Sequence, residues 1–429
     1  MPKLRTIAWI LLTAASAGSA ACAAEAERET VVTISGSNFG AEREVLLRQV
    51  DGFMAERPEI RVKFRVTPDA ADQRHQLYVQ WLSARARDPD ILWLDVIWTA
   101  EFAGAGWILP LDRFGPDTSA FFPSVVEANS WEGRLYALPL FVDVGMLYWR
   151  TDLMDSPPAT LDDLARVARG AMARDGLPYG FVWQGARYEG LVTVFLEHLG
   201  AFGGEILDEA GAVVVDEEPA VRALRFMREA IRDGIVPRSA LTWQEEPTRF
   251  AFQNGQAAFM RNWPYAFPVM QDSAESRVAG RFSVAPMPAG EGGRPSAALG
   301  GNMLAINSNT EYPEAAYALI EYLTRPEQML ERARVVGQFP TRQALYDDPE
   351  LARALPIPAV EARRIIERAV PRPVTPVYTE LSQILQVRLH RALTGQQEPE
   401  AALADAAREM RNLLRRVGLE PGESVAAGR

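Results

Sequence analysis

Apolar and polar positions alternate along the first part of the chain in blocks that predict short strands separated by amphipathic helices. Residues 31–35 and 60–66 have the period-two pattern of strands, and residues 91–96 form an almost continuous apolar run. Such a run is typical of a parallel strand that is covered on both faces. Between the strands, residues 41–56 and 72–86 have the spacing of helices. This alternation predicts an open α/β sheet.

The same alternation returns in a second block. Thr160 precedes a helical apolar pattern, and Asp163 stands three positions later, as in a capping box. Further strands are predicted at residues 181–183, 257–261, 282–285 and 303–306, and further helices at residues 191–199, 219–233 and 247–254. The last helix carries one apolar stripe, formed by Leu403, Ala406, Met410, Leu413 and Val417. Because 429 residues exceed what one simple core holds, we predict two lobes.

Composition and charge narrow the classes of function. With 48% hydrophobic and 24% charged residues, the chain has the composition of a soluble globular protein. A net charge of -11 argues against a nucleic-acid partner held by phosphate contacts. Cys22 is the single cysteine, so no intrachain disulfide can form. The three histidines, His75, His198 and His390, are far apart in sequence, so neither a zinc site nor a cofactor is expected.

The N-terminus has the pattern of a secretory signal. Lys3 and Arg5 precede an apolar run at residues 7–15, and small residues follow to residue 24. The run is shorter than the roughly 20 apolar residues that a membrane span needs. We therefore expect residues 1–24 to be a signal peptide and the mature protein to be exported.

Cys22 ends the segment Ser19-Ala20-Ala21-Cys22, which resembles the lipid-attachment box of bacterial lipoproteins. The match is imperfect because Ser19 stands where an aliphatic residue is usual. Two interpretations stay open. Either Cys22 is lipidated and becomes the first mature residue, or the signal is cleaved near Ala24 and Cys22 is removed.

Three acidic residues fall where ligands bind in α/β proteins, at or near the ends of strands. Glu42 follows the first predicted strand, Asp95 ends the third, and Asp143 lies in an apolar segment further on. A carboxylate at the end of an apolar strand needs a partner, since burial of an unpaired charge is costly. For Asp95 the alternative to a ligand contact is an ion pair with arginine or a helix cap. For Glu42 it is a solvated helix start.

Aromatic residues flank a proline in the segment Arg261-Asn262-Trp263-Pro264-Tyr265. Aromatic faces beside carboxylates and amides suit sugars, because a pyranose has an apolar C–H face and an equator of hydroxyls. The alternative is that Trp263 and Tyr265 are ordinary aromatics of the core or of the lobe interface.

Several segments resemble a known family. Trp-Glu-Gly-Arg-Leu-Tyr-Ala-Leu-Pro at 131–139 and Leu-Tyr-Trp-Arg-Thr-Asp-Leu at 147–153 look like the hinge region of extracellular solute-binding proteins of bacterial ABC importers. Phe-Gln-Asn-Gly-Gln-Ala-Ala-Phe at 252–259 is similar to another segment of that superfamily. The trehalose/maltose-binding branch is resembled most, at residues 95–98, 105–112, 181–185, 188–191, 261–266 and 370–373.

The resemblance implies an α/β, two-lobed periplasmic-binding-protein (Venus-flytrap) fold with a hinge and a central cleft. The first lobe would comprise residues 30–142 and 302–355, the second residues 143–301 and 356–418, and residues 419–429 a flexible tail. It also implies a monomeric binding protein, not an enzyme, in the periplasm or at the outer face of the cytoplasmic membrane. Its partners would be a small α-linked gluco-disaccharide such as trehalose or maltose and the permease subunits of an ABC importer.

The resemblance also implies a set of ligand contacts. The polar ones are Glu42, Arg74, Asp95 and Asp143; the aromatic ones are Trp263 and Tyr265; and Arg342 would reach the sugar hydroxyls. Glu245 or Glu246 would lie near the cleft, with the choice left open. Two positions depart from the branch, since Phe141 stands where a tyrosine is frequent and Asn302 where a tryptophan occurs. These departures leave the exact sugar open.

Two other functions remain compatible with the sequence. Paired carboxylates in an aromatic cleft are also typical of an exported glycoside hydrolase, although no hydrolase motif is present. A sensor subunit that presents sugar to a receptor would have the same binding site as an importer subunit.

Overall fold

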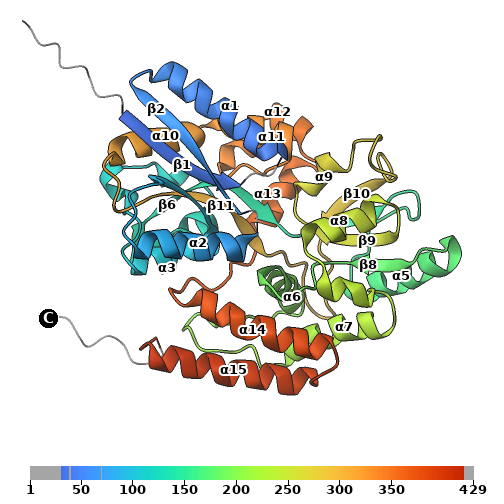
Figure 1. The fold of residues 1–429 in the computed structure, drawn as a ribbon. Coiled ribbons are helices and arrows are strands. Elements are labelled where there is room, and N and C mark those ends of the chain that lie inside the picture. Colours follow the sequence, from blue (N-terminus) through green and yellow to red (C-terminus); the bar gives the residue numbers. More distant parts are fainter. Residues whose placement is uncertain (1–29, 38–39, 69, 420–429) are drawn as a thin grey trace, which may run out of the picture.

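The structure is a computed structural model that describes residues 30–37, 40–68 and 70–419. The predicted signal peptide, Cys22 and nearly all of the predicted tail lie outside these ranges. Two α/β lobes lie side by side, each built around its own sheet (Figure 1). The helices and strands predicted from the apolar pattern are present, so the predicted fold class is confirmed.

The first lobe contains a five-stranded sheet in the order β2-β1-β3-β11-β6. Its strands are β1 (Thr30–Ser37), β2 (Ile60–Thr67), β3 (Ile91–Asp95), β6 (Ala137–Val144) and β11 (Leu299–Ile306). Strand β1 pairs parallel with β2 and β3, whereas β11 pairs antiparallel with β3 and β6. A two-stranded hairpin, β4 (Ser130–Trp131) and β5 (Arg134–Leu135), lies outside this sheet.

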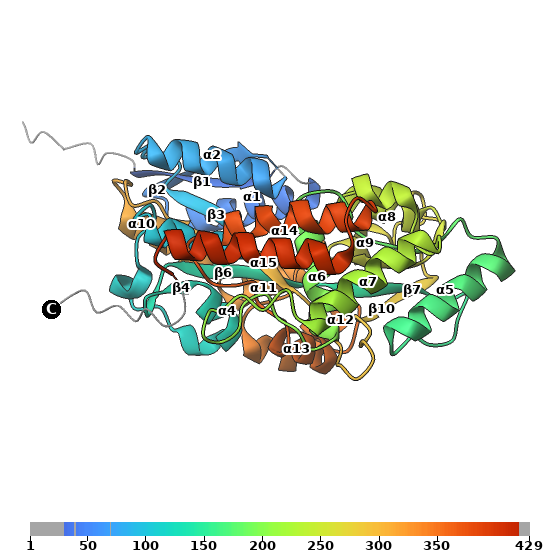
Figure 2. The same ribbon diagram turned by 90° about the horizontal axis from the view of Figure 1, so that it is seen from below.

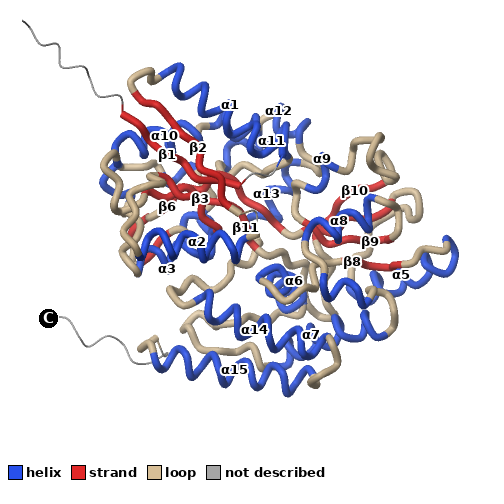
Figure 3. Tube along the Cα trace, viewed as in Figure 1, coloured by secondary structure: helices blue, strands red, loops and turns tan. Residues whose placement is uncertain are grey.

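Helices pack around this sheet (Figure 3). They are α1 (Gly40–Glu56), α2 (Ala71–Ser83), α3 (Thr99–Gly104), α4 (Pro123–Ala128), α10 (Pro313–Leu323), α11 (Pro326–Val336), α12 (Pro349–Ala354) and α13 (Ala359–Glu367). Helix α1 buries Leu46, Val50 and Phe53, as its apolar spacing predicts, and contacts β1, β2, α10 and α11. Helices α4 and α13 contact β6 at the opposite edge of the sheet.

The second lobe contains a four-stranded sheet in the order β10-β7-β9-β8. Its strands are β7 (Met146–Arg150), β8 (Tyr179–Val182), β9 (Ala257–Asn262) and β10 (Phe282–Pro286). Its helices are α5 (Leu161–Asp175), α6 (Glu189–Ala201), α7 (Glu218–Arg232), α8 (Glu245–Gln253), α9 (Ala266–Val269), α14 (Tyr378–Leu393) and α15 (Pro399–Arg416). Helices α14 and α15 lie side by side beneath α6 (Figures 1 and 2).

Local sequence explains two of these helices. The Thr160 hydroxyl accepts a hydrogen bond from the Asp163 amide at 3.1 Å, which confirms the predicted start of α5. Gly176 ends α5 in a left-handed conformation, φ 68°, that a glycine adopts without strain. Helix α15 buries Leu403, Ala406, Met410 and Leu413 of the predicted stripe against α14 and α7, whereas Val417, the last predicted member, follows the end of the helix and is exposed.

Three segments cross between the lobes. Strand β6 runs into β7 with only Gly145 between them, and the second crossing joins β10 to β11. The third joins α13 to α14 through residues 368–377. At the crossings, the Val370 amide donates to the Ala297 carbonyl at 2.8 Å, so the second and third segments pair. The predicted boundary at residue 355 precedes α13, a helix that packs on β6 of the first lobe.

Within residues 30–419, wherever the structure describes the chain, no helix has the length and apolar character needed to cross a membrane. The same described ranges contain no group of three or more His, Cys, Asp or Glu side chains arranged to hold a metal ion.

Candidate sugar-binding cleft

A cavity of about 290 Å³ lies between the two lobes. The first lobe lines it with Glu42, Ala70, Arg74, Trp93 and Asn302, and the second lobe lines it with Gln244, Glu245, Glu246, Pro247 and Tyr265. Four of the predicted contact residues are thus brought together from α1, α2, β11 and the turn before α9, which are far apart in sequence. Both acidic candidates, Glu245 and Glu246, line the cavity, so no choice between them is needed.

The first-lobe wall is built from strand ends and helix starts. Glu42 lies in the first turn of α1 and accepts a hydrogen bond from the Gln338 side chain at 2.9 Å. Arg74 is buried, donates to the Pro68 carbonyl at 3.1 Å and lies 5.3 Å from the ring centre of Trp98. These contacts hold both charged groups in fixed positions at the cavity. Glu42 is therefore more than a solvated helix start.

Asn302 and Trp93 complete this wall from neighbouring strands. The Asn302 side-chain nitrogen donates to the Leu94 carbonyl at 3.2 Å, which orients the amide. Trp93 packs edge-to-face on Phe141, with 6.0 Å between ring centres. Phe141 is buried behind Trp93 and does not line the cavity, so any effect of Phe141 on a ligand passes through the indole.

The second-lobe wall consists of the start of α8 and the turn after β9. The Tyr265 hydroxyl donates to Glu246 at 2.8 Å, and Glu246 is also paired with the buried guanidinium of Arg249. Burial alone would raise the pKa of Glu246, but Arg249 and Tyr265 hold it below its usual value. Glu245 accepts a hydrogen bond from the hydroxyl of Tyr188 at 2.8 Å. Carboxylates and a phenol therefore face the cavity in fixed geometry.

Asp95 lies beside the cavity and bridges the lobes through Arg372. Its carboxylate accepts from the Ile97 amide at 3.3 Å and from Arg372 at 3.2 Å, so both the helix-cap and the ion-pair alternatives hold. Arg372 also donates to Glu189, the first residue of α6, at 3.0 Å. Burial would lower the pKa of Arg372, but the two carboxylates raise it overall. The guanidinium is thus permanently charged and ties Asp95 of the first lobe to the second.

Asp143, near the end of β6, has the most perturbed carboxyl of the cleft. Burial raises its pKa to about 8, and the negative charges of Glu42 and Asp95 act in the same direction. The positive charge of Arg261 acts in the opposite direction but does not outweigh them. No side-chain hydrogen bond to Asp143 is found within the described ranges of the chain. At neutral pH the group is therefore mostly protonated and can donate as well as accept a hydrogen bond.

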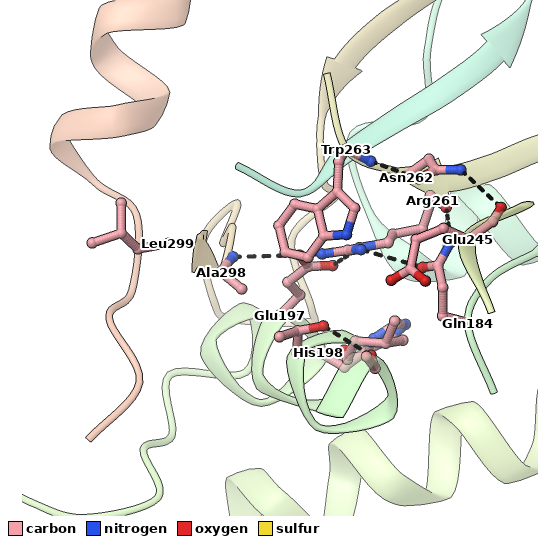
Figure 4. A network of polar contacts seen from close by, with 12 residues as sticks. Gln184, Glu197, His198, Glu245, Arg261, Asn262, Trp263, Ala298 and Leu299 are labelled. Carbon is pink, nitrogen blue, oxygen red and sulfur yellow. Dashed lines mark hydrogen bonds and ion pairs between the residues drawn. The ribbon is translucent and has the colours of Figure 1, made fainter. Parts of the chain in front are cut away.

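Trp263 follows β9 and lies on the guanidinium of Arg261, which is 3.8 Å from the indole ring centre (Figure 4). The indole is partly exposed and lies next to Gly300 and Asp143: a β-carbon at Gly300 would lie 3.3 Å from the indole and 3.5 Å from Asp143. The indole therefore lies near Asp143, although Trp263 is not among the residues that line the cavity.

Arg342 is not part of the cavity. Its guanidinium donates to the Thr324 carbonyl at 2.8 Å and lies 4.6 Å from the Phe121 ring centre. The segment that contains Arg342 does reach the site, but through Gln338 at Glu42. The arginine that contacts a cleft carboxylate is Arg372, in the Val-Pro-Arg-Pro segment at 370–373. Both residues lie in segments that carry sequence signals, but spacing alone did not indicate which side chain points inward.

The arrangement suits a neutral polyhydroxylated ligand. Carboxylates, an amide and a guanidinium can accept from or donate to hydroxyls, and Trp93 and Tyr265 offer apolar ring faces.

Comparisons with known proteins agree with this interpretation. Residues 38–330 match the family described as bacterial extracellular solute-binding protein. A protein of Deinococcus radiodurans named "Probable ABC transporter-binding protein" is 36% identical over 355 residues, which are 80% of this chain and 84% of that protein.

Solved structures give the same result. The structure described as maltose-bound MalE3 of T. maritima has a TM-score of 0.84 and 43% sequence identity, and the match covers 90% of this chain and 100% of that chain. The GacH receptor of Streptomyces glaucescens, solved unliganded and with acarbose, has a TM-score of 0.81 and 25% identity, with 90% and 99% coverage. Each match covers 90% of this chain and therefore includes both of the lobes described above.

Proposed function

Because the chain belongs to the family of bacterial extracellular solute-binding proteins, we propose that it captures an α-linked gluco-disaccharide such as maltose or trehalose. It delivers this sugar to the permease subunits of an ABC importer. The observation that carries the proposal is the cavity between the lobes, which combines Glu42, Arg74 and Asn302 on one wall with Glu245 and Tyr265 on the other. The 43% identity to a maltose-bound binding protein supports the choice of sugar class.

The walls have complementary tasks in this proposal. Carboxylates and the Asn302 amide bind the equatorial hydroxyls, and each hydroxyl that finds no partner costs about 1–3 kcal/mol. The aromatic rings pack on the C–H faces. Because contacts come from both lobes, the ligand binds the closed state more tightly than the open state, and this difference drives hinge closure.

Calorimetry with maltose, trehalose and sucrose tests the proposal, with the β-linked disaccharide lactose as the control. We expect maltose or trehalose to bind and lactose not to bind. A ligand present at about 100 times its Kd should also stabilise the native state by about 2.7 kcal/mol in thermal unfolding. Failure of all three α-linked sugars to bind would refute the proposed substrate class.

Product analysis separates binding from hydrolysis. The family comprises binding proteins, and Asp95 is engaged by Arg372 and by the Ile97 amide instead of being free to act as an acid or nucleophile. Incubation with the tightest-binding sugar should therefore return it unchanged. Steady release of glucose that Asp95→Asn abolishes would support the hydrolase alternative. Permease and ATPase genes beside this gene would favour import over a sensor role.

The family is extracellular, and we propose in addition that Cys22, outside the described residues, carries a lipid anchor. The basis is the segment Ser19-Ala20-Ala21-Cys22 alone. In its own host the full-length protein should fractionate with membranes, and Cys22→Ser should release it or block its maturation. An unmodified mature N-terminus at or beyond Ala23, found by mass spectrometry, would exclude the anchor.

A further inference from the structure

A completely buried ion pair lies where the second lobe meets the hinge. Arg261, in β9, and Glu197, in α6, both have side chains with 0% exposure. The Arg261 Nε donates to Glu197 Oε2 at 2.8 Å, and a second guanidinium nitrogen donates to Oε1. The remaining nitrogen donates to the Gln184 side chain at 3.2 Å, and Gln184 donates back to the Arg261 carbonyl at 3.1 Å. The guanidinium is thus fixed on three sides (Figure 4).

The fourth side of the guanidinium is covered by Trp263, whose ring centre is 3.8 Å away. The backbone of Trp263 is held as well: its amide donates to the Asn262 side chain at 2.9 Å, and its carbonyl accepts from the Tyr148 hydroxyl at 2.7 Å. The indole that adjoins Asp143 in the cleft therefore packs on the Arg261 guanidinium, which its own hydrogen bonds hold in place.

The same pair contacts two of the three crossings between the lobes. Glu197 Oε1 accepts from the amide of Ala298, one residue before β11, at 3.4 Å. At the first crossing, a β-carbon on Gly145 would lie 1.7 Å from Glu197 Oε1 and 2.7 Å from an Arg261 nitrogen. Since the φ of Gly145 is not positive, space and not backbone conformation requires glycine there. Any rotation of the lobes about these crossings therefore moves the backbone at Gly145 and Ala298 relative to the ion pair.

The neighbouring His198 does not perturb this charge balance. Its Nδ1 donates to the Val194 carbonyl at 2.8 Å, and burial lowers its pKa to about 4. The imidazole is therefore neutral across the physiological range.

A buried ion pair of this kind contributes little net stability, because apolar residues of similar volume are often as stable. Its role must then lie in what it positions. We propose that Arg261 and Glu197 are positioning residues, which set the Trp263 indole at the cleft and couple its position to the two hinge crossings at Gly145 and Ala298. Contact of a ligand with the indole is thereby transmitted to the open–closed equilibrium. This inference rests on the proposed sugar-binding function.

A double-mutant cycle with Glu197→Gln and Trp263→Ala tests it, with maltose as the probe in calorimetry. If the pair acts through the indole, Glu197→Gln should weaken maltose binding about tenfold in the wild-type background and less than about twofold in the Trp263→Ala background. Equal effects in both backgrounds, or no effect in either, would overturn the inference. Wild-type protein that binds no α-linked disaccharide would instead refute the proposed function.

Two further variants keep the test decisive if Glu197→Gln folds poorly. The double replacement Arg261→Met with Glu197→Leu should restore thermal stability while leaving maltose affinity about tenfold weak. Gly145→Ala should reduce the maltose-induced compaction measured by small-angle X-ray scattering.

Arg388→Gln is the matched control, since it breaks a partly buried pair with Asp405 between α14 and α15, away from the cleft. It should lower stability but leave affinity and compaction unchanged; an equal loss of affinity would mean that the Arg261 effect is merely structural.

Discussion

The two lobes hold the groups that face the cleft in place by different means. The first lobe presents charged and amide groups from helix starts and strand ends, and hydrogen bonds orient them, as Gln338 orients Glu42 and the Leu94 carbonyl orients Asn302. The second lobe presents aromatic rings that are supported by ion pairs, Arg261 beneath Trp263 and Glu246 with Arg249 beside Tyr265. The first wall is thus suited to select hydroxyls, and the second provides a rigid surface. Changes in the first wall should affect selectivity, whereas changes in the second should affect affinity for all sugars.

The largest expected effect concerns Asp143, near the end of β6 in the first lobe. Its carboxyl loses its proton near pH 4 in the unfolded chain and at about pH 8 in the folded one, facing Glu42, Asp95 and Arg261. Between these values the folded state holds the extra proton, so stability falls as pH rises from about 4 to about 8, by at most about 5 kcal/mol. Below about pH 4 this loss of stability is absent, and above about pH 8 it is complete and stays constant. Asp143→Asn should remove this slope, measured by denaturant unfolding across that range; parallel profiles for both proteins would refute it.

In the second lobe, beside the cavity, Trp263→Ala should weaken binding of every ligand by about 2–4 kcal/mol, as truncation of an aromatic hot spot commonly does. The ratios between sugars should change little, because a stacking surface does not select individual hydroxyls. Calorimetry with maltose and trehalose measures both quantities, and circular dichroism checks the fold. Unchanged affinity would assign Trp263 to the lobe core instead of the ligand site.

Glu42→Gln in the first wall should weaken binding by about 1–3 kcal/mol, because a charged acceptor for a hydroxyl becomes neutral. Glu44→Gln is the matched control: it makes the same charge change on the exposed face of the same helix and should leave affinity unchanged. If both variants lose affinity equally, the effect is one of general charge and not of contact.

Asn302 should set selectivity with a smaller effect, of about 1 kcal/mol. Its amide nitrogen is engaged by Leu94, so its oxygen is the group available to a hydroxyl. Asn302→Ala and Asn302→Trp should both reduce discrimination among trehalose, maltose and sucrose. Phe141→Tyr should change the ranking only as far as it moves Trp93. If both Asn302 variants keep the wild-type ratios in calorimetry, this position does not determine specificity.

The smallest effect is expected at Arg342. Because its guanidinium contacts Thr324 and Phe121 and not the cavity, Arg342→Gln should change the maltose Kd by less than about twofold. Arg372→Gln is the contrasting variant, since it releases Asp95 and Glu189 together. A large loss of affinity for Arg342→Gln alone would contradict the placement of this side chain.

The sequence predicted most strands and helices because their apolar periodicity is strong, as in β3 and α15. It predicted a lobe boundary between residues 142 and 143, but not that β6 and β7 form one nearly continuous path through the hinge, since that segment is mostly apolar and has no clear period. It also did not predict that β11 joins the first sheet antiparallel. Pairing between distant segments is a property of the folded topology, and no local pattern carries it.

The candidate site was partly predictable for a similar reason. Glu42, Asp95 and Asp143 were found because strand ends converge at one edge of a sheet. Trp93 was missed because, within an apolar run, an indole that faces a cavity looks like an indole that faces the core. Gln338, Arg372 and the pair Arg261–Glu197 were missed because their roles depend on neighbours about 65 to 300 residues away in sequence.

The order in which the chain is threaded through the lobes has a consequence for biogenesis. The second core needs Leu381, Leu385, Leu403 and Met410, all from helices at the C-terminal end of the chain, and the first sheet needs β11 to join β3 to β6. Neither half can close its core from contiguous early sequence, so native packing waits until nearly the whole polypeptide has been synthesised. The family is described as extracellular, and late closure of both cores lengthens the interval in which the chain is still unfolded and open to export in that form.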